Sequence, residues 1–296
     1  MQACTRQLLL PAKLEVRMFS ASTDTSTKSA STTALSAPEV AKLAQTGAVK
    51  FTTSSVNLQQ GSTLANGLVG HWTFDGQDTN WTSANTGVAY DRSGSNNTGT
   101  LTDMNRRTSV DGKLGQALNL IDSDDQVDVG TSATISPSIR TIAAWIYPRS
   151  LGGLNFGTVI ESYNGGGIPW YLQLCSGDGT ECPFTANTFV YLHNDEWAAP
   201  ENTIKFNEWQ HIAIVFDCSV DTNNPTFYYN GASVAATETR TDAVSMVCGD
   251  KNTKCIGGEP GGANFDGKID DVRIYNRTPP AEVQQLYQLG SVRITQ

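Results

Sequence analysis

Six cysteines are the residues of this chain whose type and spacing point most directly to chemistry. Cys175 and Cys182 enclose the six residues SGDGTE, and Cys248 and Cys255 enclose the six residues GDKNTK. Polar turns of this length suit short disulfide-closed hairpins, which form in oxidising compartments. We therefore predict disulfides between Cys175 and Cys182 and between Cys248 and Cys255. One alternative stays open, in which Cys218 pairs with Cys248 or remains a buried thiol.

Metal or nucleophile chemistry fits the sequence less well. Zinc sites favour CxxC-like spacing with a histidine nearby, and none of His71, His193 and His211 has a cysteine within four residues. The sequence also contains no GxSxG, P-loop or HExxH motif. His193 and His211 alternate with apolar residues, which is typical of histidines on a sheet face. The cysteines therefore predict structural bonds, and we expect a secreted or cell-surface protein.

The segments that must position these residues are short and rich in β-branched and aromatic side chains. Clusters of Gly, Asn, Asp and Ser separate them, a pattern typical of antiparallel sandwiches. The exception is Pro280–Tyr287, a helix pattern with proline in its first turn and Gly290 as a stop. We predict an all-β fold of two antiparallel sheets with this short C-terminal helix. The strand candidates are LVGHWTF, ALNLI, QVDVG, RTIAAWIYP, TVIESY, WYLQLC, TFVYLH, WQHIAIVFDC, TFYYNG and KIDDVRIYN.

The N-terminal part of the chain differs in composition from the rest. Between Ser20 and Pro38, eleven of nineteen residues are Ser or Thr. Residues 1–65 carry six basic and three acidic residues, a net charge of +3, which leaves fourteen and twenty-six, or −12, for the remainder. We predict a disordered Ser/Thr-rich segment or stalk over 1–65, a domain over 66–290 and a short tail over 291–296.

The overall charge excludes two classes of partner. The 296 residues carry a net charge of −9 and give a pI near 4.8, so the surface field repels nucleic acid and anionic lipid. No apolar run approaches the ~20 residues needed to span a bilayer. We therefore expect no nucleic-acid partner and no membrane insertion of the chain as given, and the sequence leaves the oligomeric state open.

Seven motifs follow one another through the predicted domain. They are GLVGHWTFDG, DRSGSNNTGTL, GKLGQALNLIDSDDQVDVG, TIAAWIYP, EWQHIAIVFD, FYYNGASV and FDGKIDDVRIYNRTPPAEVQQLY. In this order they resemble the LamG-like jelly-roll family of the concanavalin A-like lectin/glucanase superfamily, over residues 66–290. The resemblance implies a two-sheet jelly roll, usually secreted or displayed at a cell surface. It also implies binding of carbohydrate, protein or matrix components, often with a structural calcium ion.

The resemblance also implies where calcium would bind. Ca²⁺ takes six to eight oxygen ligands, and the fold would bring together the oxygen-bearing side chains of Asp75, Asp91, Asn97 and Asp270. In the superfamily the aspartate before the last strand's apolar alternation commonly holds the metal, which corresponds to Asp270. We expect Asp270 to share a face with Val272 and Ile274, where a buried carboxylate needs a cation or several donors. Alternatively, Asp75 and Asp91 cap turns and Asp270 accepts backbone N–H groups.

Glycosidases of the superfamily place two glutamates on one strand with an aspartate between them. This sequence has no such element: Glu161 has no carboxylate after it, and Asp195–Trp197 reads as a loop. We therefore predict no catalytic residues and a protein that is not an enzyme.

Aromatic residues give the expected ligand site. Trp72, Trp145 and Trp209 lie in strand patterns and are expected to pack, whereas the insert at 152–200 departs from the plainest family members. Its rings Trp170, Tyr191 and Trp197 are predicted to stack on a ligand. The hypothesis is a non-catalytic extracellular module that binds carbohydrate or another surface component. The alternatives are a structural or adhesive subunit that makes protein contacts and, third, a glycoside hydrolase with an unrecognised active site.

Overall fold

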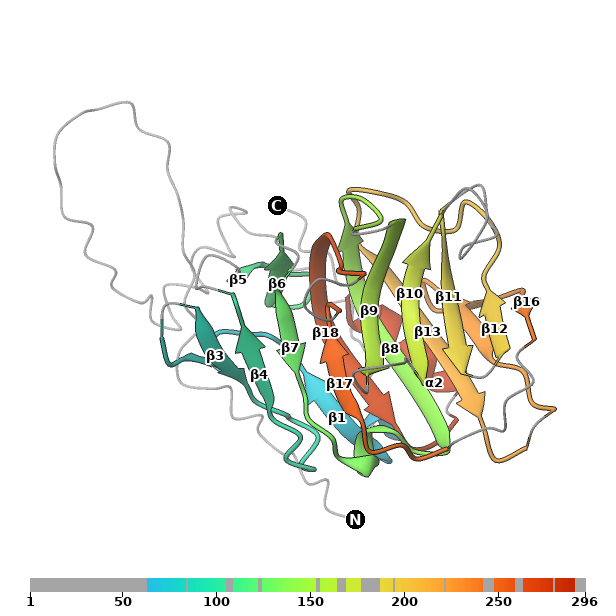
Figure 1. The fold of residues 1–296 in the computed structure, drawn as a ribbon, viewed down its shortest axis with the longest axis horizontal. Coiled ribbons are helices and arrows are strands. Elements are labelled where there is room, and N and C mark those ends of the chain that lie inside the picture. Colours follow the sequence, from blue (N-terminus) through green and yellow to red (C-terminus); the bar gives the residue numbers. More distant parts are fainter. Residues whose placement is uncertain are drawn as a thin grey trace, which may run out of the picture. The chain divides into compact units, whose positions relative to one another are not determined.

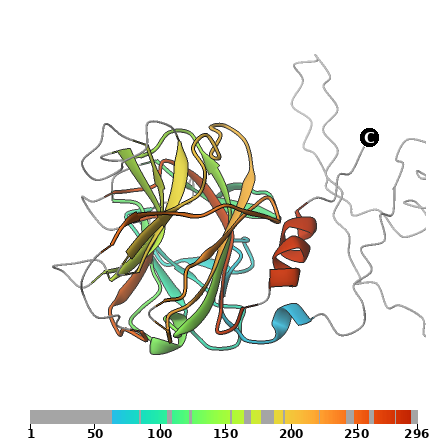
Figure 2. The ribbon, with the colours of Figure 1, turned by 90° about the vertical axis from the view of Figure 1, so that its right-hand side faces the viewer.

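Two antiparallel sheets stack face to face, and a helix lies outside one of them (Figures 1 and 2). The computed structural model describes residues 63–290 except 84, 105–108, 122–123, 153–154, 164–168, 177–186, 194, 221, 242–247, 259–262 and 279. The predicted all-β sandwich with a short C-terminal helix is confirmed. The predicted segments 1–65 and 291–296 fall almost wholly outside the described residues, so the domain limits stay predictions.

The first sheet has eight strands in the order β15-β14-β13-β8-β18-β6-β5, with β1 also pairing with β18. Strand β18 is its centre, because it pairs with β1, β6 and β8. The strands are β1 (Leu68–Trp72), β5 (Ser109–Asp111), β6 (Gln116–Leu120), β8 (Ile139–Pro148), β13 (Gln210–Asp217), β14 (Thr226–Tyr229), β15 (Ala232–Val234) and β18 (Gly267–Tyr275).

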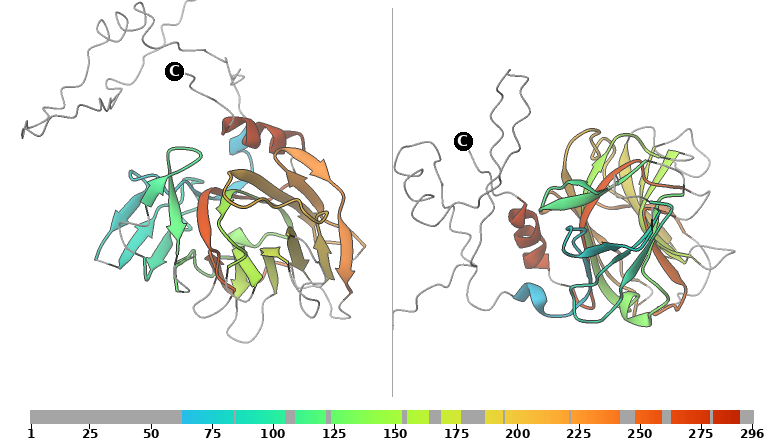
Figure 3. Two further views of the ribbon diagram at one scale, coloured as in Figure 1. Left: turned by 90° about the horizontal axis from the view of Figure 1, so that it is seen from above. Right: turned by 90° about the vertical axis from the view of Figure 1, so that its left-hand side faces the viewer.

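The second sheet has ten strands in the order β16-β12-β11-β10-β9-β17-β7-β4-β3-β2. Figure 3 shows its early strands β2, β3 and β4 at one end of the sandwich, far from β11 and β12. The strands are β2 (Thr79–Trp81), β3 (Thr86–Ala89), β4 (Gly99–Thr102), β7 (Gln126–Asp128), β9 (Phe156–Tyr163), β10 (Trp170–Cys175), β11 (Thr188–His193), β12 (Asp195–Ala198), β16 (Thr237–Arg240) and β17 (Thr253–Ile256).

All ten strand candidates from the sequence form strands, but the loop predicted at 195–197 is wrong, because those residues form β12. This four-residue strand is held by pairing on both edges, with β11 on one side and β16 on the other. The polar residues at its start made the segment look like a loop, although its last residues, Trp197 and Ala198, are buried. Long-range pairing overrides such a weak local pattern.

Strand β13 shows why several strands are apolar on both faces. Ile212, Ile214 and Phe216 point into the core between the sheets. Ala213 and Val215 point outward, where they join a second apolar cluster with residues of helix α2 (Pro280–Leu289). Both faces of this strand are therefore buried, one in the core and one beneath the helix.

The first and last described elements lie against each other. The short 3-10 helix η1 (Thr63–Ala65) contacts α2, and Thr63 donates a hydrogen bond to the Glu282 carboxylate. Arg277 pairs with the same carboxylate and donates to the Thr63 carbonyl over 2.8 Å. The described chain therefore enters and leaves the sandwich at one place.

One disulfide links the two halves of the sandwich. Cys218, just after β13, is bonded to Cys248, with 6.1 Å between their Cα atoms. The predicted Cys248–Cys255 bond is wrong, because Cys255 lies within β17 and pairs there with Glu161 of β9. The alternative Cys218–Cys248 pairing is the one observed. Cys175 is also disulfide-bonded, but its predicted partner Cys182 lies outside the described residues.

Removing the Cys218–Cys248 bond should destabilise the domain. In the chain-entropy model, cross-linking residues 30 apart contributes about 3–4 kcal/mol. The double variant Cys218→Ala/Cys248→Ala should therefore lose about that much free energy of unfolding in urea titrations. Non-reducing peptide mapping should find Cys218 joined to Cys248, and a Cys248–Cys255 peptide would contradict this assignment.

Candidate functional site

Two aspartates hold one loop at the edge of the eight-stranded sheet. Asp270 Oδ2 accepts hydrogen bonds from the backbone N–H groups of Lys113 (2.7 Å) and Leu114 (2.8 Å). Asp75 Oδ1 accepts one from the N–H of Gln116 over 2.7 Å. The structure thus brings Asp75 and Asp270 to the same loop between β5 and β6, as predicted for two of the four metal-ligand candidates.

Glycines make this close approach possible. Gly115 has φ +67°, and a Cβ atom there would lie 2.0 Å from Asp75 Oδ1. A Cβ atom at Gly112 would lie 2.6 Å from Asp270 Oδ2. The GKLG sequence therefore gives the carboxylates room beside the backbone amides.

A β-bulge in β18 places Asp270. The pairing with β8 shifts between Asp270 and Arg273, and Asp271 takes the left-handed conformation with φ +49°. Asp270 consequently pairs with Trp145 on the outer face of the sheet, while Val272 faces the core. The expectation that Asp270 shares a face with Val272 and Ile274 is wrong, because one extra residue in a strand reverses the alternation.

The pKa values of the neighbouring residues Asp270 and Asp271 shift in opposite directions. Burial, together with the charges of Asp271 and Asp75, raises the pKa of Asp270 to about 8, although the two backbone N–H donors act to lower it. Its Oδ1 atom is buried and has no hydrogen-bond partner in the described part of the chain. Burial would also raise the pKa of Asp271, but His71 and Arg273 lower it to about 2. Asp270 is therefore the group that lacks a counter-charge.

Asp91 and Asn97, the other two ligand candidates, form a separate network. Asp91 accepts hydrogen bonds from the N–H groups of His71, Ser93 and Asn97. Asn97 in turn donates to the Val69 carbonyl over 2.7 Å. Both residues thus close the 91–97 turn, which is the turn-capping alternative, and the structure does not bring them to the Asp75 and Asp270 loop.

One other group has the composition of a metal site. Within the described ranges, His193, Cys218 and Cys248 are the only three His, Cys, Asp or Glu residues whose ligand atoms all lie within 4.8 Å of one another. Both sulfur atoms belong to the disulfide, so thiolate ligands are not available there in this oxidation state.

The three aromatic rings predicted to stack on a ligand belong to the core. Trp170 and Tyr191 are 0% exposed and Trp197 is 3% exposed. Strands β10, β11 and β12 direct all three inward. The expected ligand site at Trp170, Tyr191 and Trp197 is therefore wrong for this conformation, because a buried ring offers no face to a ligand.

A polar and aromatic row that the sequence did not indicate crosses the outer face of the eight-stranded sheet. Asn119 of β6 pairs with Lys268 of β18, which pairs with Tyr147 of β8. Trp209, just before β13, lies edge-on to Tyr147 with 5.7 Å between ring centroids. We call these four residues the outer row, and all four are partly exposed. Trp209 was expected to pack in the core, but it is partly exposed. The polar residues Asn207 and Glu208 just before it were the one signal in the sequence that pointed to exposure.

The row is preorganised by its neighbours. The Lys268 ammonium lies 5.1 Å from the Tyr147 ring centroid. Arg149 donates to the side-chain Oδ1 atom of Asn119 and pairs with Asp266 at 2.7 Å. Three inter-strand spacings make the row about 14 Å long.

Comparison with known proteins agrees with this architecture. A family model described as the concanavalin A-like lectin/glucanases superfamily matches residues 122–283. The chain belongs to this superfamily. No curated protein matches the sequence.

Solved structures of the superfamily fold include binding domains and parts of hydrolases. Domain 4 of AbnA, a GH43 extracellular arabinanase from Geobacillus stearothermophilus in complex with arabinotriose, is 21% identical with a TM-score of 0.53. The match covers 75% of this chain and 98% of that domain. A Trypanosoma rangeli sialidase in complex with 2,3-difluoro-KDN is 14% identical with a TM-score of 0.51, over 81% of this chain and 36% of the sialidase. The chain thus spans about a third of the sialidase, and at these identities the likeness shows the fold alone.

The contacts of Asp75 and Asp270 with the loop at 112–116, which we call the aspartate cradle, give a prediction with a matched control. Gly115→Ala adds a Cβ atom against Asp75, whereas Gly94, at φ +89°, has nothing within 4 Å of an added Cβ atom. Both substitutions strain a left-handed residue by about 1–2 kcal/mol, but Gly115→Ala should cost about 1–3 kcal/mol more because it displaces a hydrogen-bonded carboxylate. Chemical denaturation of both variants measures the difference, and equal losses would contradict the cradle.

Proposed function

We propose that the chain is a non-catalytic carbohydrate-binding module whose ligand lies on the outer row. The observation that supports this most directly is the pair of partly exposed rings, Tyr147 and Trp209, set beside the polar groups of Lys268 and Asn119. Aromatic faces pack on apolar surface while neighbouring polar groups fix orientation. Carbohydrates combine an apolar ring face with hydroxyl groups, so this row matches their chemistry.

The polar end of the row suits hydroxyl groups. Arg149 donates to Asn119 Oδ1, so the side-chain amide nitrogen Nδ2 of Asn119 is the group that donates to a ligand. The Lys268 ammonium adds up to three further donors. A neutral or acidic sugar is favoured over a basic one, because the row carries a positive charge.

The carboxylates on the other sheet support a binding role without hydrolysis. Glu161 of β9 and Glu196 of β12 lie in one row of the ten-stranded sheet, with Tyr171 and Leu192 between them. Three strand spacings put their backbones about 14 Å apart, whereas glycosidase carboxyl groups are about 5–9.5 Å apart. Tyr171 also donates a hydrogen bond to Glu196.

The disulfides support an extracellular location. The Cys218–Cys248 bond and the bonded Cys175 fit an oxidising compartment. No helix in the described ranges is long and apolar enough to cross a bilayer. We therefore propose that the module acts outside the cell.

Trp209→Ala should weaken binding of a polysaccharide found by glycan screening. Stacking of bases on aromatic side chains contributes about 1–3 kcal/mol each, and we expect a loss of this size in isothermal titration. The matched control is Trp81→Ala, since Trp81 is also partly exposed but lies on β2 of the other sheet.

Unchanged affinity in Trp209→Ala, or an equal loss in Trp81→Ala, would move the ligand away from the outer row. Release of reducing sugar ends from the bound polysaccharide would overturn the non-catalytic assignment. Self-association of the module without any glycan ligand would instead favour the assembly-subunit alternative.

We further propose that Asp75 and Asp270 hold a structural calcium ion. The fit rests on the buried Asp270 Oδ1 atom, which lacks a partner in the described part of the chain, beside the nearby charge of Asp75. Carboxylate oxygens are the ligands that Ca²⁺ prefers, and backbone carbonyls or water supply the remainder. The ion would neutralise the two carboxylates and stiffen the loop between β5 and β6.

Chelation should therefore lower the melting temperature of the wild-type protein. A ligand at a hundred times its dissociation constant adds about 2.7 kcal/mol, or roughly 5–10 °C for a domain of this size. Asp270→Asn should melt at the same temperature with calcium and with EDTA. Asp91→Asn is the control, since it loses turn hydrogen bonds but should keep the calcium response. A calcium shift that survives in Asp270→Asn would sink the assignment.

A further inference from the structure

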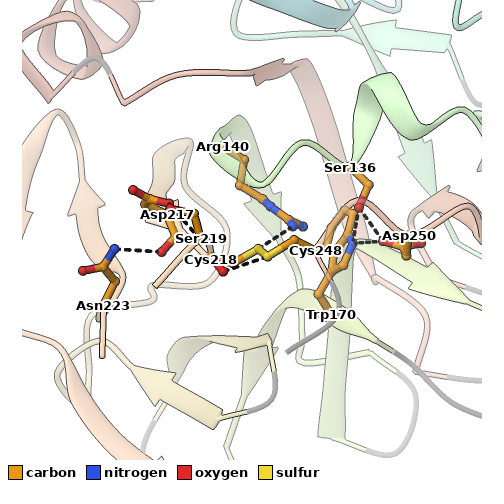
Figure 4. Close-up of a disulfide and its surroundings, with 9 residues drawn as sticks. All are labelled: Ser136, Arg140, Trp170, Asp217, Cys218, Ser219, Asn223, Cys248 and Asp250. Carbon is orange, nitrogen blue, oxygen red and sulfur yellow. Dashed lines mark hydrogen bonds between the residues drawn. A yellow bond between two sulfur atoms is a disulfide. The ribbon is translucent and has the colours of Figure 1, made fainter. Parts of the chain in front are cut away.

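A buried arginine lies between the two sheets without a matching negative charge. Arg140 of β8 is 0% exposed, and its Nε and Nη1 atoms have no hydrogen-bond partner in the described residues. Its guanidinium lies 5.3 Å from the Trp170 ring centroid and 3.8 Å from the Cys218 sulfur (Figure 4). Neither neighbour carries a charge, and an isolated buried charge is very costly.

The buried carboxylate that contacts Trp170 is already engaged. Asp250 forms a 2.9 Å ion pair with the fully buried ammonium of Lys254. It also accepts hydrogen bonds from Ser136, Ser162 and Trp170. No ion pair joins it to Arg140 within the described residues. Among the described residues of this buried group, Arg140 and Lys254 are therefore two cations beside the single anion Asp250, which leaves a net charge of +1.

Further buried donors lie in the opposite sheet, around the residue that pairs with Arg140. The Tyr191 hydroxyl, the Trp197 indole nitrogen and both ring nitrogens of His193 are buried and have no hydrogen-bond partner among the described residues. All three rings surround Phe216, at centroid distances of 5.5, 6.1 and 5.5 Å. Phe216 is directly paired with Arg140 across β13 and β8. These three side chains and Arg140 thus all lie around Phe216, and we call this group the Arg140 compartment.

The donors share one chemical character. The guanidinium, the indole and the hydroxyl all offer hydrogen atoms, and burial lowers the pKa of His193 to about 3, so this ring is neutral and offers one N–H. Waters could satisfy individual donors, but neutral molecules leave the excess positive charge in place. An anion satisfies both demands at once.

We propose that the Arg140 compartment binds a small monovalent anion, with chloride as the expected occupant. The anion would accept hydrogen bonds from Arg140, Tyr191 and Trp197 and balance the guanidinium charge. Its size is limited because every lining residue is at most 3% exposed. A carboxylate or phosphate on a larger molecule would find no path between side chains packed this closely. The site is separate from the outer row and from the aspartate cradle.

The test measures melting temperature against chloride at constant ionic strength, with sodium gluconate as the replacement salt. Raising chloride from far below to about a hundred times its dissociation constant should raise the melting temperature by roughly 5–10 °C. Arg140→Met should abolish the chloride dependence. Lys251→Met, which removes an exposed positive charge, is the matched control and should retain it.

A second measurement keeps the proposal testable if Arg140→Met does not fold. Crystals of the wild-type protein grown in bromide should show an anomalous peak within hydrogen-bond distance of the Arg140 guanidinium. Water in place of that peak, or a melting temperature that responds equally to gluconate and chloride, would overturn the proposal.

Discussion

A carboxylate that takes its hydrogen bonds from backbone amides fixes one end of this sandwich. Asp270 projects from the bulge of the central strand β18 and accepts the N–H groups of Lys113 and Leu114. That contact determines where the loop before β6 runs, and Gln116 of the same loop then binds Asp75. The bulge therefore orders a turn distant in sequence. Gly112 and Gly115 leave room there for the carboxylate oxygens of Asp270 and Asp75, which a Cβ atom would clash with. Three separate motifs of the sequence meet in this single arrangement.

The sequence predicted the architecture well, because ten strand patterns and one helix pattern carry strong periodicity. It also placed Asp75 and Asp270 in one site through motifs of the family. It misjudged the face of Asp270, since a bulge cannot be read from alternation and here reverses it. The short strand β12 was missed for a related reason. Its stability comes from the neighbours β11 and β16, not from its own residues.

The aromatic residues show a second limit of local patterns. Trp170, Tyr191 and Trp197 belong to the insert at 152–200, yet pairing in the ten-stranded sheet turns them into the core. Trp209 precedes an apolar strand, yet it lies at the strand's start, where its ring stays partly exposed. Whether a residue is exposed depends on which face of the sheet its side chain points to, and predicting that face requires knowledge of the strand register. The cysteine pairing was open for the same reason, because equal spacing does not tell which side chains lie together.

The contacts of η1 with α2 have a mechanical consequence. Thr63 and Glu282, together with Arg277, tie the two ends of the described chain to one point. A pulling force applied through those ends would load this small set of bonds first and peel α2 from the sheet, rather than shear the paired strands. The Cys218–Cys248 bond limits how far such unravelling can proceed, because it covalently joins two segments that are 30 residues apart. A module built in this way can be attached within a longer polypeptide at a single site and can yield under tension before the eight-stranded sheet is disturbed.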